Sequence, residues 1–257
     1  MKVVILAGGY GTRLSEETDL TPKPMVKIGN MPILWHIMNI YSYYNFNEFI
    51  ICLGYKGEQI KNFFINYSPN KIDDTFLDFS NPKKEFKNNI LENWKIHLVD
   101  TGKDTVTGGR LKRVKELVGK DDFCFTYGDG LTNANILEVV NFHKNNKKLA
   151  TVLAVQPPER FGVLDINKEN GVDGFFEKYS GTQTYINGGF FVLSPKVIDF
   201  IEGDHISWER EPVTEICNRK EMIAFKHHDF WYAMDTLKDK RYLNDLWEKN
   251  IAPWKVW

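Results

Sequence analysis

The sequence is most informative at Leu6-Ala7-Gly8-Gly9-Tyr10-Gly11-Thr12-Arg13-Leu14. Apolar residues predict a buried strand over residues 3–7, which leads into a loop with three glycines. Glycine lets the backbone approach a phosphate closely and direct several amide N–H groups toward it. Thr12 and Arg13 add a hydroxyl and a guanidinium group at the same place. We therefore predict a phosphate-binding loop here, with a simple tight turn as the alternative.

Two common nucleotide-binding motifs do not fit this loop. A Walker loop would end in Gly-Lys-Ser/Thr, and no such ending follows Gly11. A Rossmann G-x-G-x-x-G pattern that begins at Gly9 fails at Leu14. The spacing therefore argues against an oxidoreductase that binds a nicotinamide cofactor.

The rest of the chain predicts an α/β fold. Up to residue 148, short apolar runs (49–53, 95–99 and 123–127) alternate with helical patterns (32–44, 58–67 and around 111–118). This alternation is typical of βαβ units and a largely parallel sheet. From residue 149 onward, strands are predicted at 150–155, 162–166, 172–176 and 185–193, followed by helices at 195–201, 212–219 and 239–249. Residues 68–93 have weak periodicity and predict an irregular excursion.

We expect one domain over residues 1–257, because no linker or repeat separates its two halves. The expected architecture is a Rossmann-like, mostly parallel mixed sheet flanked by helices, with a smaller β-rich portion. Residues 1–148 form the first half and residues 149–257 the second.

Composition excludes several classes of protein. The formal net charge is −1, so no global field attracts nucleic acid or an anionic membrane, and we expect neither as a partner. Cys52, Cys124 and Cys217 are far apart, which favours reduced thiols over a disulfide framework. No run of residues is long enough to be a signal-peptide core or a membrane span. We therefore expect a cytoplasmic protein.

Two charged residues, Lys23 and Asp129, stand out as candidates for ligand binding. Lys23 lies between two prolines, which stiffen the backbone and suit a fixed phosphate clamp, although a solvated lysine in a turn is the alternative. Asp129 follows a predicted strand, at the edge of an α/β sheet where ligands bind, but could also cap a turn or helix. Asp235, by contrast, could be the N-cap of the helix that follows it.

The motifs taken together resemble the sugar nucleotidyltransferase family. The resemblance rests on residues 6–13 with Lys23-Pro24-Met25, and continues through residues 127–130, 176–178, 186–189 and 231–236. Residues 32–38, 107–113 and 252–255 are similar to those of the glucose-1-phosphate cytidylyltransferases within that family. The chain departs from many relatives at Tyr179, where they carry proline after Glu-Lys.

The resemblance implies a nucleotide-diphospho-sugar transferase fold and a role for each matching residue. The implied catalytic residues are Arg13, Lys23, Asp129 and Asp235, and the two aspartates would bind Mg²⁺. The implied sugar-binding residues are Tyr127, Glu177, Lys178, Asn187 and Gly188. The implied nucleotide-binding residues are Leu6, Ala7, Gly8, Gly9, Tyr10, Gly11, Thr12, Arg13, Lys23, Thr105, Gly108, Gly109, Arg110 and Gly128.

The resemblance also implies the substrates, CTP and glucose 1-phosphate, and a homo-oligomeric enzyme that serves dideoxyhexose assembly for lipopolysaccharide O-antigen. A UTP- or dTTP-dependent enzyme and a catalytically silent regulatory subunit of the same fold remain alternatives. We expect Arg110 to help select cytosine, because its donors match the O2 and N3 acceptors of that base. Contact with phosphate or solvent is the alternative for Arg110.

Overall fold

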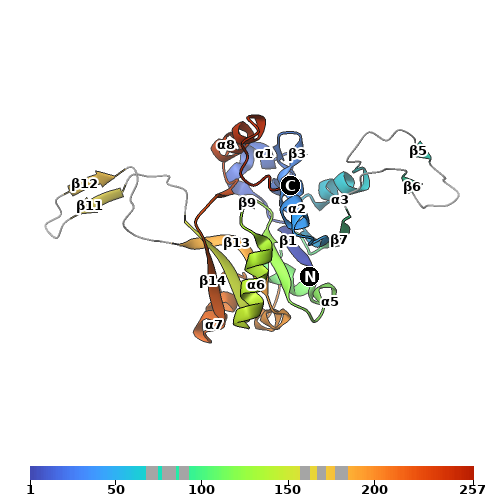
Figure 1. The fold of residues 1–257 in the computed structure, drawn as a ribbon. Coiled ribbons are helices and arrows are strands. Elements are labelled where there is room, and N and C mark those ends of the chain that lie inside the picture. Colours follow the sequence, from blue (N-terminus) through green and yellow to red (C-terminus); the bar gives the residue numbers. More distant parts are fainter. Residues whose placement is uncertain (68–74, 77–84, 87–92, 157–162, 167–171, 177–184) are drawn as a thin grey trace.

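The structure is a computed structural model that describes residues 1–67, 75–76, 85–86, 93–156, 163–166, 172–176 and 185–257 (Figure 1). Most of the predicted irregular excursion over residues 68–93 therefore lies outside the described residues. Within it, β5 (Thr75–Phe76) pairs with β6 (Glu85–Phe86) in antiparallel orientation.

The described strands and helices follow the predicted alternation. The other strands are β1 (Val3–Ala7), β2 (Lys27–Ile28), β3 (Met31–Pro32), β4 (Glu48–Leu53), β7 (Lys95–Asp100), β8 (Phe123–Tyr127), β9 (Gly130–Thr132), β10 (Ala150–Val155), β11 (Val163–Ile166), β12 (Val172–Phe176), β13 (Ile186–Leu193), β14 (Met222–His227) and β15 (Trp231–Ala233). The helices are η1 (Thr12–Leu14), α1 (Ser15–Thr18), η2 (Lys23–Met25), α2 (Ile33–Tyr43), α3 (Gly57–Ile65), α4 (Thr107–Arg113), α5 (Lys115–Val118), α6 (Ile136–Asn146), η3 (Pro195–Phe200), α7 (Glu211–Asn218) and α8 (Leu237–Glu248).

One seven-stranded sheet, in the order β14-β10-β13-β8-β1-β4-β7, organises the molecule. Its strands come from both sides of residue 149. Strands β8, β1, β4 and β7 are parallel, and β10 is parallel to β14. Only β13 is antiparallel to both of its neighbours, β8 and β10. The sheet is thus mixed but mostly parallel, as predicted.

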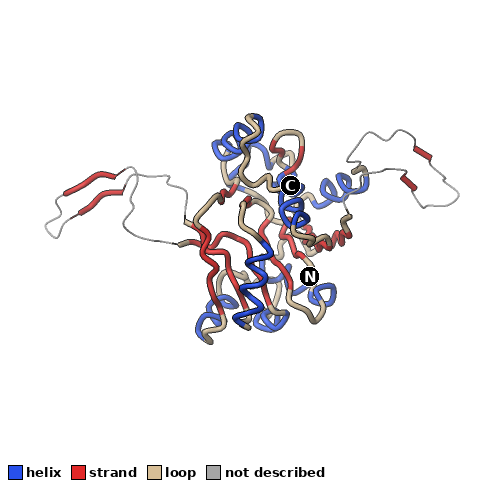
Figure 2. The backbone as a smooth tube through the Cα atoms, in the orientation of Figure 1, coloured by secondary structure: helices blue, strands red, loops and turns tan. Residues whose placement is uncertain are grey.

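Helices cover both faces of this sheet, because the side chains of each central strand alternate between two apolar cores. In β1, Val3, Ile5 and Ala7 belong to the core beneath α2, α3, α6 and α8. Val4 and Leu6 belong to the core beneath α4, α5, η3 and α7. In Figure 2, α6 crosses in front of the strands. The predicted α/β class is confirmed.

Several elements differ from the prediction. The apolar stripe from Leu111 to Val118 is divided between α4 and α5, which are separated at Val114. The helix predicted at 195–201 is the 3₁₀ helix η3. The prediction missed α6, β14 and the pair β9–β15. No helix among the described residues is long and apolar enough to cross a membrane.

Candidate active site

A cavity of about 540 Å³ opens at the edge where the parallel strands end. Its lining comes from the loop after β1, from η2, from the segment after β7 and from the end of β8. Among the predicted residues, the following line it: Leu6, Ala7, Gly8, Gly9, Tyr10, Gly11, Thr12, Lys23, Thr105, Arg110, Tyr127, Gly128 and Asp129. The folded chain therefore brings most of the predicted nucleotide-binding set to one cavity.

A second, smaller cavity of about 200 Å³ adjoins the first. The two cavities share Tyr127 and Asp129 in their walls. The smaller cavity also contains Asn187, Gly188 and Asp235. Because β13 is antiparallel to β8, its first residues reach the same sheet edge as the end of β8. This geometry places the predicted sugar-binding residues Asn187 and Gly188 beside Tyr127.

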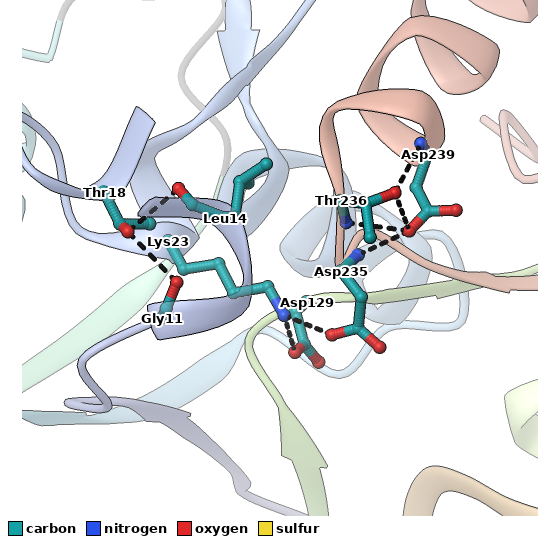
Figure 3. Close-up of polar contacts among 8 residues, drawn as sticks. All are labelled: Gly11, Leu14, Thr18, Lys23, Asp129, Asp235, Thr236 and Asp239. Carbon is teal, nitrogen blue, oxygen red and sulfur yellow. Dashed lines mark hydrogen bonds and ion pairs between the residues drawn. The ribbon is translucent and has the colours of Figure 1, made fainter. Parts of the chain in front are cut away.

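The ammonium group of Lys23 bridges Asp129 and Asp235 (Figure 3). Its Nζ lies 2.6 Å from Asp129 Oδ2 and 2.7 Å from Asp235 Oδ1. Lys23 is buried, with 8% of its surface exposed. Burial disfavours the charged ammonium, but Asp129 and Asp235 outweigh this effect and raise the pKa of Lys23 above its ordinary value. The two carboxylates thus converge on one cation-sized position.

The short ladder between β9 and β15 brings the two aspartates together. Gly130 pairs with Ala233, and the amide of Met234 donates to the carbonyl oxygen of Asp129 at 2.9 Å. Asp129 therefore directly precedes one strand of the pair, while Asp235 follows the other by two residues. Neither three-residue strand was predicted, although the ladder sets the geometry of the site.

The start of α8 fixes the backbone of Asp235. Asp239 Oδ2 accepts hydrogen bonds from the amides of Asp235 and Thr236 and from the Thr236 hydroxyl (Figure 3). Burial alone would raise the pKa of Asp239, but its hydrogen bonds to Thr236 and Tyr232 lower it below the ordinary value. Thr236 is the N-cap of α8 and forms a capping box with Asp239. The alternative prediction that Asp235 is the N-cap is therefore wrong.

The three glycines of the first loop, Gly8, Gly9 and Gly11, have different surroundings. A Cβ on Gly8 would lie 2.3 Å from Nη1 of Arg110, so this position accommodates the arginine. Gly11 has a φ of +66° and lies against Thr18, whose hydroxyl donates to the carbonyl oxygens of Gly11 and Leu14 (Figure 3). No atom lies within 4 Å of a Cβ built on Gly9. The open approach that a phosphate needs is thus found at Gly9.

Arg110 is buried beneath this loop and donates to oxygen atoms of the protein. It is 4% exposed, and within the described part of the chain no carboxylate is among its hydrogen-bond partners. Its acceptors, at 2.7–3.3 Å, are the carbonyl oxygens of Leu53, Gly102, Gly8 and Lys103 and the hydroxyl oxygen of Thr101. Burial lowers the pKa of Arg110 from its ordinary value. Arg110 therefore joins the carboxyl ends of β1, β4 and β7.

Gly108 and Gly109 do not line either cavity, although they were predicted to border the nucleotide. A Cβ on Gly108 would lie 2.5 Å from the carbonyl oxygen of Ile206, and one on Gly109 would lie 2.5 Å from Cα of Asp204. Both glycines therefore allow the segment 204–208 to approach α4 closely.

Three predicted residues lie wholly or partly outside the described part of the structure. Glu177 and Lys178 lie outside the described residues. Arg13 belongs to η1, but its side chain lies outside the described part of the structure. Conversely, the sequence predicted no site role for Glu209, a carboxylate in the lining of the larger cavity. It also predicted none for Trp231 in the smaller cavity, although Trp231 begins the motif over residues 231–236. No familiar motif contains Glu209, and its only signal is proximity to Trp208, which is fully buried.

Among the described residues, no group of three or more His, Cys, Asp or Glu side chains could hold a metal ion. A divalent cation between Asp129 and Asp235 would therefore need further oxygen ligands from substrate or water. This arrangement is typical of Mg²⁺, which binds one or two carboxylates together with substrate phosphates.

Comparison with known proteins agrees with this geometry. The sequence matches the nucleotidyl transferase family over residues 2–244. It is 53% identical, over the full length of both chains, to the glucose-1-phosphate cytidylyltransferase of Salmonella typhimurium. It is also 43% identical, over the full length of both chains, to a probable glucose-1-phosphate cytidylyltransferase of Bacillus subtilis.

A solved structure supports the fold independently. HddC from Yersinia pseudotuberculosis superposes with a TM-score of 0.69 at 24% identity, covering 96% of this chain and 99% of that one. Enzymes of the nucleotidyl transferase family generally use divalent metal ions. On the full-length identities, the chain belongs to the nucleotidyl transferase family and, within it, to the glucose-1-phosphate cytidylyltransferases.

Proposed function

We propose that this enzyme transfers a cytidylyl group from CTP to glucose 1-phosphate and produces CDP-glucose and pyrophosphate in the two adjoining cavities. The observation that carries the proposal is the convergence of Asp129 and Asp235 on one cation, at the wall shared by both cavities. The larger cavity takes the nucleotide, and the smaller cavity takes the sugar. The phosphates of both substrates then meet at Asp129.

Asp129 and Asp235 fit a bound Mg²⁺ ion. The ammonium of Lys23 shows that both carboxylates face one cationic position, and two carboxylates suit a hard divalent ion that also binds substrate phosphates. Bound there, Mg²⁺ would supply positive charge shared by the nucleotide and sugar phosphates. When no substrate is present, the ammonium of Lys23 offsets one of the two negative charges of these carboxylates.

The reaction needs no protein nucleophile. A phosphate oxygen of glucose 1-phosphate attacks the α-phosphorus of CTP, a new P–O bond forms, and the bond to the leaving pyrophosphate breaks. The chain's contribution is to align these groups and to stabilise negative charge. The open backbone at Gly9 approaches the phosphates, and Lys23 reaches them from the buried side of the same cavity. Arg13 would add a second positive charge in the loop.

Base recognition is assigned to Thr105 and Arg110, which line the same cavity. Most donors of Arg110 are already bonded to the protein, and its longest bond, 3.3 Å, joins Nη2 to the carbonyl oxygen of Lys103. This donor is the one most easily redirected to a base. We therefore propose that Arg110 gives cytosine one hydrogen bond instead of two.

Pyrophosphate release across CTP, UTP, dTTP and ATP, each with several sugar 1-phosphates, tests the proposal. We expect fastest release with CTP and glucose 1-phosphate. Faster release with UTP or dTTP would favour the alternative base specificity, and no release with any pair would favour a silent regulatory subunit.

Light scattering after size-exclusion chromatography tests the predicted homo-oligomer, and cell fractionation tests the predicted cytoplasmic location.

A further inference from the structure

The carboxylate of Glu209 connects the walls of the two cavities. The hydroxyl of Tyr127 donates to Oε1 of Glu209 at 2.6 Å, and the hydroxyl of Thr107 donates to Oε2 at 2.6 Å. Thr107 lines the larger cavity, whereas Tyr127 lines both. Each carboxylate oxygen is therefore bound to a different wall.

Buried neighbours hold Glu209 in this position, although its own side chain is exposed. Trp208 is fully buried, and its backbone amide donates to the Thr107 hydroxyl at 2.9 Å. Gly108 allows the carbonyl oxygen of Ile206 to approach α4 closely. The segment that carries Glu209 is thus packed against the start of α4, and a surface glutamate acquires a fixed position.

The hydrogen bonds from Thr107 and Tyr127 to Glu209 are charge-assisted, because the acceptor is a carboxylate. None of the ion pairs among the described residues includes Glu209, so no basic side chain competes for its oxygens. Hydrogen bonds from neutral hydroxyls to a carboxylate are shorter and stronger than those between neutral groups. Burial, followed by the charge of Glu209, raises the pKa of Tyr127, so its hydroxyl stays protonated and remains a donor.

The chain of contacts continues into the smaller cavity. The amide nitrogen of Asn187 donates to the Tyr127 hydroxyl oxygen at 3.3 Å. Asn187 also accepts, through Oδ1, a hydrogen bond from the amide of Gly189 at 2.8 Å. A continuous chain of hydrogen bonds therefore runs from the nucleotide side to the sugar side through Thr107, Glu209, Tyr127 and Asn187.

We propose that Glu209 is a positioning residue that couples the two substrate cavities by holding the hydroxyls of Thr107 and Tyr127. This inference rests on the proposed assignment of nucleotide to the larger cavity and glucose 1-phosphate to the smaller one. A nucleotide that packs against Thr107 further stabilises the bonded position of Glu209, which in turn holds Tyr127 and Asn187 for the sugar. By linkage, each substrate strengthens the binding of the other to the same degree.

Glu209→Gln tests this role, because glutamine keeps the size of the side chain but removes the charge and one of the two acceptors. We expect the KM for glucose 1-phosphate to rise about tenfold, with kcat changed less than about threefold. The matched control is Glu211→Gln, an exposed glutamate two residues away that lines neither cavity. The control should retain both KM values.

A double-mutant cycle tests the coupling itself. Thr107→Val and Tyr127→Phe each remove one donor, and we expect their effects on the KM for glucose 1-phosphate to be less than multiplicative when Glu209 is present. In a Glu209→Ala background the same two substitutions should become independent. Thermal melts of every variant are measured alongside the kinetics.

Four results are decisive. Unchanged KM values in Glu209→Gln would overturn the proposal, as would an equal loss of kcat/KM for both substrates that follows a loss of thermal stability. Independent effects of Thr107→Val and Tyr127→Phe in the presence of Glu209 would also overturn it. A wild-type enzyme that releases no pyrophosphate from CTP and glucose 1-phosphate would refute the proposed function first, and this inference with it.

Discussion

Two buried cations lie at the same sheet edge, but they are neutralised in different ways. Lys23 contacts two carboxylates, Asp129 and Asp235. Among the described residues, the hydrogen bonds of the Arg110 guanidinium go only to carbonyl and hydroxyl oxygens. Lys23 and Arg110 are 8% and 4% exposed. Because the two side chains are similarly buried, burial alone does not determine the role of a buried charge.

The partners explain the difference. The side chains of Asp129 and Asp235 line the cavities, so the proposed substrate phosphates and metal ion would be able to rearrange the bonds of Lys23. The acceptors of Arg110 include the backbone at the ends of β1 and β4. Releasing all of them would separate the strand ends that shape the cavity. We therefore assign Lys23 mainly to chemistry and Arg110 mainly to the shape of the loop.

The strongest test of this comparison removes the carboxylates. We expect Asp129→Asn and Asp235→Asn each to lower kcat by several orders of magnitude while the fold remains intact, because each loses a metal ligand but keeps a hydrogen-bonding side chain. Pyrophosphate release at saturating Mg²⁺ measures kcat, and circular dichroism checks the fold. A near-normal rate in either variant would remove that residue from the metal site.

Lys23→Ala gives the next largest effect. We expect kcat/KM to fall about a hundredfold to a thousandfold, because one positive charge at the phosphates is lost. The melting temperature should change by only a few degrees, and Mg²⁺ alone should raise it more than in the wild type, because two carboxylates lose their cation. Arg13→Ala should likewise lose more activity than stability.

A Lys23→Ala enzyme with normal activity would contradict the phosphate-clamp assignment. If Mg²⁺ shifted the melting temperatures of wild type and variant equally, Asp129 and Asp235 would not form the cation site. Lys27→Ala, an exposed lysine close in sequence that lines neither cavity, is the matched control for both measurements.

Arg110→Lys tests the other side of the comparison. We expect the free energy of unfolding to fall by about 2 to 4 kcal/mol, because lysine has fewer donors for the buried acceptors around position 110. The preference for CTP over UTP, measured as a ratio of kcat/KM values, should decrease by about tenfold, which corresponds to one lost hydrogen bond.

The matched control is Arg113→Lys on the same helix, an exposed arginine that contacts Asp204. It should retain both stability and base preference. If Arg110→Lys lowered kcat/KM equally for CTP and UTP, Arg110 would shape the loop without reading the base. A variant as stable as the wild type would contradict the structural role.

Much of the fold could be predicted, because strong local patterns coincide with the sheet. The strands 3–7, 123–127 and 150–155 were predicted to the residue, since each is a continuous buried run. Helix α6 was missed although Ile136, Val139 and Val140 have helical spacing, because its second half, residues 141–146, is mostly polar. The edge strand β14 was missed because its side chains are half-buried or exposed and its pattern is weak.

The site was predictable only in part, for a different reason. Motifs identified Lys23, Asp129 and Asp235 as important, but their contact depends on the pairing of β9 with β15. Two strands of only three residues leave almost no pattern in the local sequence that would predict their pairing. Glu209 had only the weak signal of following Trp208 in the sequence, because its position depends on the packing of Trp208 against α4.

A third buried basic side chain, His36, extends the comparison, because this one is kept neutral. It is fully buried among tryptophan rings, and Nε2 lies 3.0 Å from the carbonyl oxygen of Ile28. The indole N–H of Trp254 donates to Nδ1 at 3.4 Å. Burial lowers the pKa of His36 to about 4 from 6.5. A proton on Nδ1 would place a donor against the donor of Trp254.

The sign of the pH effect follows from this pKa. Because the folded state binds the proton less tightly than the unfolded state, His36 contributes stability above pH 6.5, and that contribution is lost as the pH falls toward 4. Between pH 7.5 and pH 5 the free energy of unfolding should decrease by about 2 kcal/mol through this residue. Urea denaturation of the wild type and of His36→Gln at both pH values measures the difference, with the exposed His97→Gln as control. If the two variants and the wild type lost the same stability over this range, the proton would be taken up elsewhere. His36 would then not be the buried base that opposes protonation.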